Sequence, residues 1–297
     1  MLRFVTQNLH IIFLRYAVSC MWEIHPKTFR VKNVWYGRTV IKSSYKLCYE
    51  HAQDILDGKT ELEMKELIPE LSKFSGKQLK EKFQEVKESL TYLSTIAKKW
   101  QNTRLKEGAL NLESTEVQFE FEEKSMTNIK PKEHLAIHET VAECMIMANH
   151  WVARKIAEVF PSNSILRMHP PPKKDNFEEL KICAKSKGWT VETFSNKALA
   201  ESLDRCTDSH DPTVNFLLRS LATIAMVQAV YFSTGSVKQE EWNHYGLALD
   251  KYTHFTSPIR RLGSVQILRN PVRGRGVHHK YHWGDLKISV LIYFTQS

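Results

Sequence analysis

Apolar and polar residues alternate along residues 16–23 and 28–36, two segments separated by His25-Pro26-Lys27. A period of two is typical of a half-buried strand, so the pattern predicts an antiparallel strand pair. A third alternating segment, residues 108–123, places Val117, Phe119 and Phe121 on one face. It predicts one more strand, followed by a polar loop around Pro131.

The remaining periodicity is helical. It predicts helices over residues 134–160, 176–187 and 213–231, the last beginning at Asp211-Pro212, and a helix over 45–56 capped by Ser43 or Ser44 and ending at Asp57-Gly58. Residues 61–106 predict a solvated helix with one buried face. Its apolar positions at helical spacing are Leu79, Phe83, Val86, Leu90 and Leu93. The expected fold class is α+β, with antiparallel strands followed by a mostly helical body.

Composition adds a constraint on partners. Of 297 residues, 42 are Lys or Arg and 33 are Asp or Glu, a formal charge of +9. This balance favours a polyanion, and a nucleic acid or an acidic membrane surface would serve equally well. No apolar segment has the length of a transmembrane helix, and residues 1–16 indicate neither a signal peptide nor an anchor. The 5 cysteines are scattered, which favours a reducing compartment over a disulfide framework.

The segment of residues 252–261, YTHFTSPIRR, carries the most chemistry. Arg260 and Arg261 offer forked donors suited to phosphate oxygens, Thr256 and Ser257 add neutral donors, and Pro258 suits the first turn of a helix. Tyr252 and Phe255 supply aromatic rings on which bases could stack. An ordinary capped helix start is the alternative, but it leaves the arginine pair unexplained.

This segment, in the frame of residues 244–261, closely resembles the signature of the RNase II/RNB family of 3′-to-5′ exoribonucleases. Residues 16–58 and 139–250 resemble the same nuclease domain, and the likeness is strongest to the exosome-associated eukaryotic branch with its cytoplasmic Dis-three-like members. The resemblance implies a fold that is the C-terminal portion of an RNB-type catalytic domain. We expect an unmatched N-terminus over 1–15, a partial RNB exoribonuclease domain over 16–269 and a divergent tail over 270–297, as in a truncated or alternatively spliced product.

The resemblance also implies function. Such enzymes degrade single-stranded RNA to nucleotide monophosphates with Mg²⁺ held by clustered aspartates. It implies single-stranded RNA as ligand, exosome subunits as candidate partners, a cytoplasmic location, and neither DNA nor membrane as partner. Those aspartates belong just before Tyr16, yet residues 1–15 contain no Asp or Glu. We therefore expect no metal ligands in this chain and a catalytically incomplete polypeptide. A non-catalytic module that binds RNA or assembles with the exosome is the main alternative, and a fragment without independent function is a third.

For several individual residues the sequence allows more than one role. By resemblance Glu143 and Arg260 are catalytic, whereas helical spacing alone makes Glu143 a salt-bridged surface residue. Tyr49 is either a stacking platform for the terminal nucleotide or a core residue. Arg167 and His169 belong either to an exposed loop or to a phosphate-contacting or helix-docking segment.

Three other groups of residues invite a metal-site hypothesis. Asp204, Asp208 and Asp211 are close in sequence near His210, but a helix cap and a polar turn explain them better. The spacing from His138 to His150 does not fit a zinc motif, and His278, His279 and His282 suit a solvated basic tail.

Overall fold

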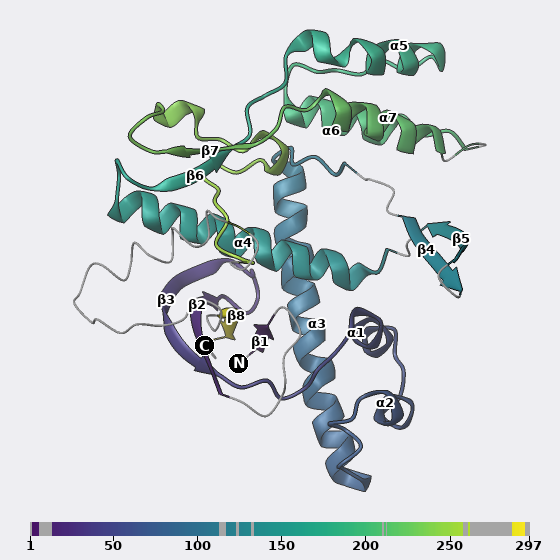
Figure 1. The fold of residues 1–297 in the computed structure, drawn as a ribbon, viewed down its shortest axis with the longest axis vertical. Coiled ribbons are helices and arrows are strands. Elements are labelled where there is room, and N and C mark those ends of the chain that lie inside the picture. Colours follow the sequence, from purple (N-terminus) through teal and green to yellow (C-terminus); the bar gives the residue numbers. More distant parts are fainter. Residues whose placement is uncertain are drawn as a thin grey trace.

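The computed structural model describes residues 2–5, 14–112, 117–122, 125–131, 134–209, 211, 213–257, 261 and 287–294. Helix α4 (Ala136–Val159) lies between a four-stranded sheet on one side and a two-stranded ribbon on the other (Figure 1). The fold class predicted from the sequence, α+β with antiparallel strand pairs and a mostly helical body, is confirmed.

The four-stranded sheet has the order β1-β8-β2-β3. The predicted strand pair is present as β2 (Arg15–Ile24) and β3 (Val31–Ile41), antiparallel with Cys20 opposite Tyr36. Strand β8 (Lys287–Phe294) runs parallel to β2 and antiparallel to β1 (Leu2–Val5). Part of the predicted divergent tail is therefore a strand of this sheet, which its sequence alone did not indicate.

The sheet is attached to the helices by apolar side chains of β2. Cys20, Trp22 and Ile24 are fully buried, and the Trp22 ring meets that of Trp100 edge-on at 5.1 Å between centroids. Tyr36 donates a hydrogen bond from its hydroxyl to the Trp151 carbonyl of α4 (2.9 Å). Because these residues alternate along the strands, one face of the sheet becomes the core.

The three helices that follow β3 in the chain pack around a second apolar cluster. They are α1 (Tyr49–Leu56), α2 (Glu61–Leu67) and the long α3 (Gly76–Lys106). All five apolar positions predicted for the buried face of residues 61–106 are buried on α3. The single predicted helix is two helices because Pro69 lies between them and cannot supply a backbone N–H. The predicted serine cap of α1 was wrong: the helix begins four residues later, where the Cys48 thiol accepts from the His51 N–H (3.4 Å).

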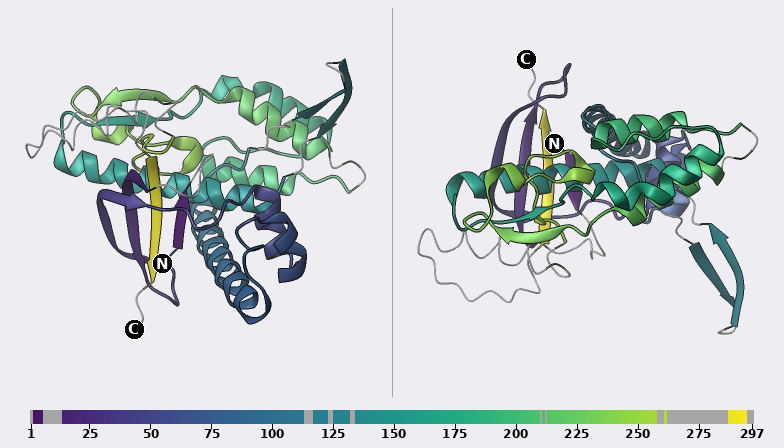
Figure 2. Two further views of the ribbon diagram at one scale, coloured as in Figure 1. Left: turned by 60° about the horizontal axis from the view of Figure 1, so that its bottom comes forward. Right: turned by 90° about the horizontal axis from the view of Figure 1, so that it is seen from above.

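Two strands form a ribbon that projects from the helices, β4 (Val117–Glu122) and β5 (Ser125–Pro131) (Figures 1 and 2). The sequence predicted the first of them. It placed a polar loop where β5 lies, because Ser125 to Pro131 carries few apolar residues. Pairing with β4 supplies the backbone hydrogen bonds that the sequence pattern did not reveal.

The second ribbon consists of β6 (Ile165–Met168) and β7 (Val230–Ser233). Between them the chain forms a 3₁₀ turn, Lys174–Phe177, and the helices α5 (Glu178–Ser186), α6 (Asn196–Arg205) and α7 (Thr213–Ala225), which share a third apolar cluster. The helix predicted over 213–231 ends at Ala225, so its last part was wrong. Phe232 instead pairs with Leu166 across the ribbon, and both are buried against α4.

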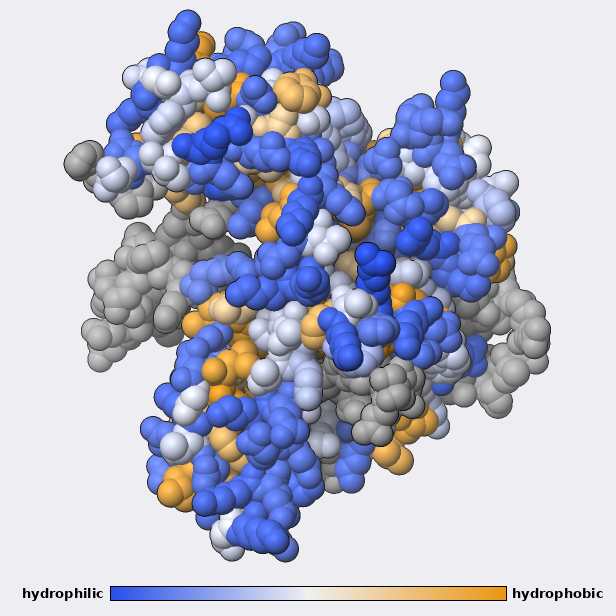
Figure 3. All heavy atoms as spheres, turned by 180° about the vertical axis from the view of Figure 1, so that it is seen from behind, coloured by the Kyte–Doolittle hydropathy of each residue, from blue (hydrophilic) through white to orange (hydrophobic). Residues whose placement is uncertain are grey.

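Two 3₁₀ turns, Gln239–Glu241 and Tyr245–Leu247, follow β7 and return the chain to α4. The face seen in Figure 3 is mostly hydrophilic, with apolar side chains in small separate groups. None of the helices within the described ranges has the length and apolarity needed to cross a bilayer.

Candidate nucleic-acid interface

Asn149, on α4, holds the signature segment in place. Its Nδ2 donates to the Tyr252 hydroxyl (2.9 Å), and its Oδ1 accepts from the backbone N–H groups of Phe255 (2.8 Å) and Thr256 (2.9 Å). The side chain is almost completely buried. One amide therefore satisfies both ends of a five-residue segment, and loss of it would leave buried polar groups without partners.

The other side of the segment is bound to β6. The Thr253 hydroxyl donates to the Ile165 carbonyl (2.8 Å), and the Arg167 N–H donates to the Tyr252 carbonyl (2.7 Å). His150, next to Asn149 on α4, forms a hydrogen bond from Nδ1 to the Lys251 carbonyl (2.8 Å). The segment is thus fixed between α4 and β6.

The two aromatic rings expected to contact bases are buried. Tyr252 is 6 % exposed and Phe255 is 2 % exposed, so neither presents an open face. Burial raises the pKa of Tyr252, whose hydroxyl already accepts from Asn149. We conclude that both rings support the backbone of the segment in this conformation.

The polar residues of the segment have different environments. Thr256 is also buried, whereas Ser257 is partly exposed and has a φ of 60°, in the left-handed region that non-glycine residues adopt infrequently. Arg261 is partly buried, and its charge lowers the pKa of Tyr252, a smaller effect than burial. Arg260 and Pro258 lie outside the described residues.

Arg167 contacts the exposed edge of the β6–β7 ribbon. Its guanidinium lies over the ring of Tyr231 at 5.1 Å, and the two residues are directly opposite each other in the strand register. The Tyr231 hydroxyl forms a hydrogen bond with Nδ1 of His254, a residue of the signature segment. The exposed-loop alternative for Arg167 does not hold, because it lies on a strand and is half-buried.

His169 fixes the loop before the signature. Its Nδ1 accepts from the Gly246 N–H (3.1 Å), and a Cβ at residue 246 would lie 3.1 Å from that same nitrogen. The His169 ring packs edge-on against His244, 5.1 Å between centroids. Burial is the main cause that lowers the pKa of both imidazoles, to about 3 for His244, so both are neutral at pH 7. The predictions for His169 were an exposed loop, a phosphate contact or helix docking; the contacts observed join it to residues 244–246, and its predicted phosphate contact stays a prediction.

Glu143 is buried and paired, not a surface residue. Arg104 of α3 donates to it twice, from Nε to Oε1 (2.9 Å) and from Nη2 to Oε2 (2.5 Å), and the two side chains are 10 % and 3 % exposed. The Nη1 of Arg104 also donates to the Leu247 carbonyl (3.2 Å). The pair therefore joins α3, α4 and the loop that precedes the signature, and it uses both oxygens of Glu143.

The Mg²⁺ implied by the resemblance does not fit the residues that the structure describes. Within those residues no three His, Cys, Asp or Glu side chains converge to hold a metal ion, and Glu143 is occupied by a guanidinium. The three clustered aspartates have separate partners: Asp204 pairs with Arg219 (2.7 Å), Asp208 pairs with Lys187 (3.4 Å), and Asp211 accepts from the Thr213 N–H (3.0 Å) at the start of α7. His278, His279 and His282 lie outside the described ranges.

Tyr49 begins α1 and is 43 % exposed, so it is not a core residue. Its ring contacts that of His138 edge-on, 4.4 Å between centroids. The exposed part of the ring leaves the predicted stacking role open.

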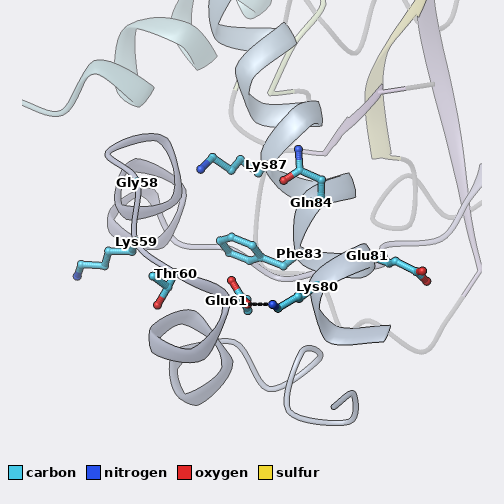
Figure 4. A pocket seen from close by; sticks show the side chains of 9 residues that line it. All are labelled: Gly58, Lys59, Thr60, Glu61, Lys80, Glu81, Phe83, Gln84 and Lys87. Atoms are coloured by element: carbon cyan, nitrogen blue, oxygen red, sulfur yellow. Dashed lines mark ion pairs between the residues drawn. The ribbon is translucent and has the colours of Figure 1, made fainter. Parts of the chain in front are cut away.

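A surface pocket of about 530 Å³ lies elsewhere, between the α1–α2 turn and the start of α3 (Figure 4). None of the residues predicted for the site lines it; the lining residues are Gly58, Lys59, Thr60, Glu61, Lys80, Glu81, Phe83, Gln84 and Lys87. Two of its lysines are paired, Lys59 with Asp54 and Lys80 with Glu61. We assign no function to this pocket.

Comparison with known proteins identifies the family. The sequence profile described as RNB domain matches residues 11–268. The chain belongs to the RNB family. It is 38% identical over 257 residues to a Caenorhabditis elegans protein named probable exosome complex exonuclease RRP44. The aligned region covers 86% of this chain and 24% of that relative. The chain thus spans about a quarter of the length of such curated relatives.

Solved structures of RNB-type proteins share the fold. Mycoplasma genitalium RNase R, in complex with ribose methylated single-stranded RNA, matches with a TM-score of 0.69 at 22% identity, covering 88% of this chain and 37% of that one. The structure of yeast Ssd1, described as a pseudonuclease, matches with a TM-score of 0.59 at 18% identity, covering 86% and 28%. The fold therefore occurs both in a protein named as a ribonuclease and in one described as a pseudonuclease, so the fold alone does not show whether a chain hydrolyses RNA.

Three residues of the interface were not predicted from the sequence as parts of a site: Asn149, Arg104 and Tyr231. Asn149 is a polar residue in the middle of an otherwise apolar helix face, and that was the available signal. Arg104 and Tyr231 have partners that are far away in sequence: Glu143 is 39 residues from Arg104, and His254 is 23 residues from Tyr231. No local pattern therefore pointed to them.

Proposed function

We propose that this chain is the RNA-binding part of an RNB exoribonuclease domain, and that it grips single-stranded RNA without hydrolysing it by itself. The relatives that match over most of the chain are named exonucleases, which supports RNA degradation as the activity of the whole protein. The proposal for this chain rests chiefly on one observation. The signature segment is hydrogen-bonded to both α4 and β6, whereas both carboxylate oxygens of Glu143, the candidate catalytic residue, accept hydrogen bonds from Arg104.

Charge supports RNA as the ligand. The chain carries a formal +9, and single-stranded RNA offers a regular series of phosphates to neutralise. Arg260 and Arg261 are proposed phosphate contacts, with Ser257 and Thr256 as neutral neighbours. Arg167, whose backbone N–H donates to the Tyr252 carbonyl of the same segment, is a further proposed RNA contact. Arg260 also remains a proposed catalytic residue of the complete domain, where it would stabilise charge on the scissile phosphate.

The lack of fit for a metal supports the second half of the proposal. Two-metal hydrolysis needs several carboxylates that converge on one site. Residues 1–15 contain no Asp or Glu, and the aspartates 204, 208 and 211 are paired or capping. Mg²⁺ therefore belongs to the proposed activity of the complete domain, held by carboxylates other than these.

We also propose partners and a location for the protein. Exosome subunits are proposed partners, since the curated relatives are named as exosome components. A cytoplasmic location is proposed from the family likeness, and the five free thiols are compatible with a reducing compartment.

Two assays on one preparation of the purified protein test this proposal. Purified chain 1–297 is incubated with 5′-labelled single-stranded RNA, first for binding across a salt series and then for release of mononucleotides with Mg²⁺ or Mn²⁺. We expect salt-sensitive binding and negligible release. Metal-dependent degradation that disappears in Glu143→Gln would overturn the non-catalytic assignment, and absence of binding at low salt would overturn RNA binding.

A further inference from the structure

Arg167 is a half-buried cation that has no counter-charge among the residues that the structure describes. In the part of the chain that the structure describes, its guanidinium contacts the Tyr231 ring and forms neither an ion pair nor a hydrogen bond. The imidazoles of His169 and His244 do not neutralise the charge of Arg167, because that charge itself contributes to lowering their pKa. A guanidinium that is partly desolvated and keeps its donors uncommitted is a favourable site for a phosphate.

Tyr231 provides an exposed ring that is nevertheless fixed. It is 41 % exposed, with Arg167 over its face and His254 bonded to its hydroxyl. The His254 ring lies 5.6 Å from that of Tyr231 and 5.7 Å from the buried ring of Tyr252. Since the ring is already held, a base that stacks on it loses little additional conformational freedom in the protein.

A purely structural role explains these features less well. A tyrosine that only packs a two-stranded ribbon would be buried, as Phe232 is on the same strand at 8 % exposure. An arginine that only stabilises the fold would be paired with a carboxylate, as Arg104 is with Glu143. Tyr231 and Arg167 differ from these neighbours in both respects.

We infer that Arg167, Tyr231 and His254 form a nucleotide subsite for single-stranded RNA, in addition to the signature arginines. A base stacks on the exposed part of the Tyr231 ring, the Arg167 guanidinium binds an adjacent phosphate, and His254 holds the tyrosine in orientation. This inference rests on the proposed RNA-binding function and adds a stacking position at the β6–β7 edge.

The experiment measures binding of a single-stranded RNA that carries 2-aminopurine, whose fluorescence falls when the base stacks. The variants are Tyr231→Ala, Tyr231→Phe, Arg167→Gln and the pair Arg260→Ala with Arg261→Ala. Tyr92→Ala is the matched control, because Tyr92 is also an exposed tyrosine, at 52 %, but lies on α3. Melting curves of each variant give the folded fraction, to which the affinities are referred.

We expect Tyr231→Ala to weaken binding roughly tenfold and to abolish the quenching at one position of the RNA, while Tyr231→Phe keeps the quenching. Arg167→Gln should lower the slope of log affinity against log salt by about 0.7, the value for one phosphate of a single strand. Tyr92→Ala should bind like the unmodified chain.

The outcomes separate this inference from the proposed function. If the paired Arg260 and Arg261 variant loses affinity while Tyr231→Ala and Arg167→Gln match Tyr92→Ala, the subsite is absent and RNA binding stands. If the unmodified chain binds no RNA, both proposals fail together. Should Tyr231→Ala not fold, the salt slope of Arg167→Gln decides, and an unchanged slope overturns the subsite.

Discussion

Arg104 and Glu143 face each other through two parallel hydrogen bonds, 2.9 Å and 2.5 Å long, although their residues are 39 positions apart on two different helices. The carboxylate that the family resemblance placed near the scissile phosphate is thus neutralised inside the fold. A buried ion pair of this kind needs both members, because either one alone is an uncompensated charge.

The first prediction concerns that pair. Arg104→Met alone should lower the free energy of unfolding by about 3–5 kcal/mol, since it leaves the Glu143 carboxylate buried and unpaired. The double variant Arg104→Met with Glu143→Leu should recover most of the loss. Urea denaturation of the singles and the double measures the coupling.

Glu85→Gln serves as the control, because Glu85 forms an exposed pair with Lys82 on the same helix α3. It should change stability by less than about 1 kcal/mol. If the Arg104 variant is no less stable than this control, the buried pair does not have the role described here.

The second prediction concerns the signature arginines. Replacing Arg260 and Arg261 together by alanine should weaken binding of all RNA sequences alike, because phosphate contacts carry no base information. The slope of log affinity against log salt should fall by about 1.4, corresponding to two phosphates of a single strand. Fluorescence anisotropy with oligo-A, oligo-U and a mixed sequence measures both effects. A loss restricted to one sequence contradicts the assignment.

The third prediction concerns Tyr49. Its ring is exposed beside His138, so Tyr49→Ala should cost about 1–3 kcal/mol of RNA affinity, and Tyr49→Phe should be close to the unmodified chain. Binding and melting are measured on the same samples. If Tyr49→Ala lowers the melting temperature and leaves the affinity of the folded fraction unchanged, the residue supports the helix and does not stack.

The fourth prediction concerns acid stability. Burial, followed by repulsion from His169 and Arg167, lowers the pKa of His244 to about 3, against 6.5 for an ordinary histidine. The unfolded chain therefore takes up a proton as the pH falls below about 6.5, whereas the folded chain does not until about pH 3. Stability that is complete above pH 6.5 should be lost progressively over this range.

His244→Phe removes this titration. Its unfolding free energy should fall less between pH 7.5 and pH 4.5 than that of the unmodified chain, by roughly 2.7 kcal/mol at most, because the unfolded imidazole titrates over about two pH units of this range and each unit corresponds to 1.36 kcal/mol. His150 and His169, whose pKa values burial also lowers, still titrate in both proteins. Parallel stability curves for the two proteins would show that His244 does not titrate as described.

The sequence by itself determined the elements in which periodicity and packing agree. The β2–β3 pair alternates because one face meets α4, and the buried face of α3 repeats at helical spacing because it meets α1 and α2. Asp211 at the start of α7 was predictable for a local reason, since a side-chain cap needs only residues two or three positions away. The signature and the family were likewise carried by ten contiguous residues.

The tertiary structure decided everything that depends on distant partners. It ended α7 at Ala225, and residues 230–233 instead pair with β6, where Phe232 is buried against Leu166 and α4. It buried Tyr252, which lies among polar residues, and left Tyr231 exposed, although Tyr231 lies between Val230 and Phe232 in the sequence. It paired Glu143 with Arg104, and among the described residues it gave Arg167 an aromatic ring but no carboxylate partner. Local pattern records which residues are apolar, but only the packed fold brings an arginine to a carboxylate or leaves it for a ligand.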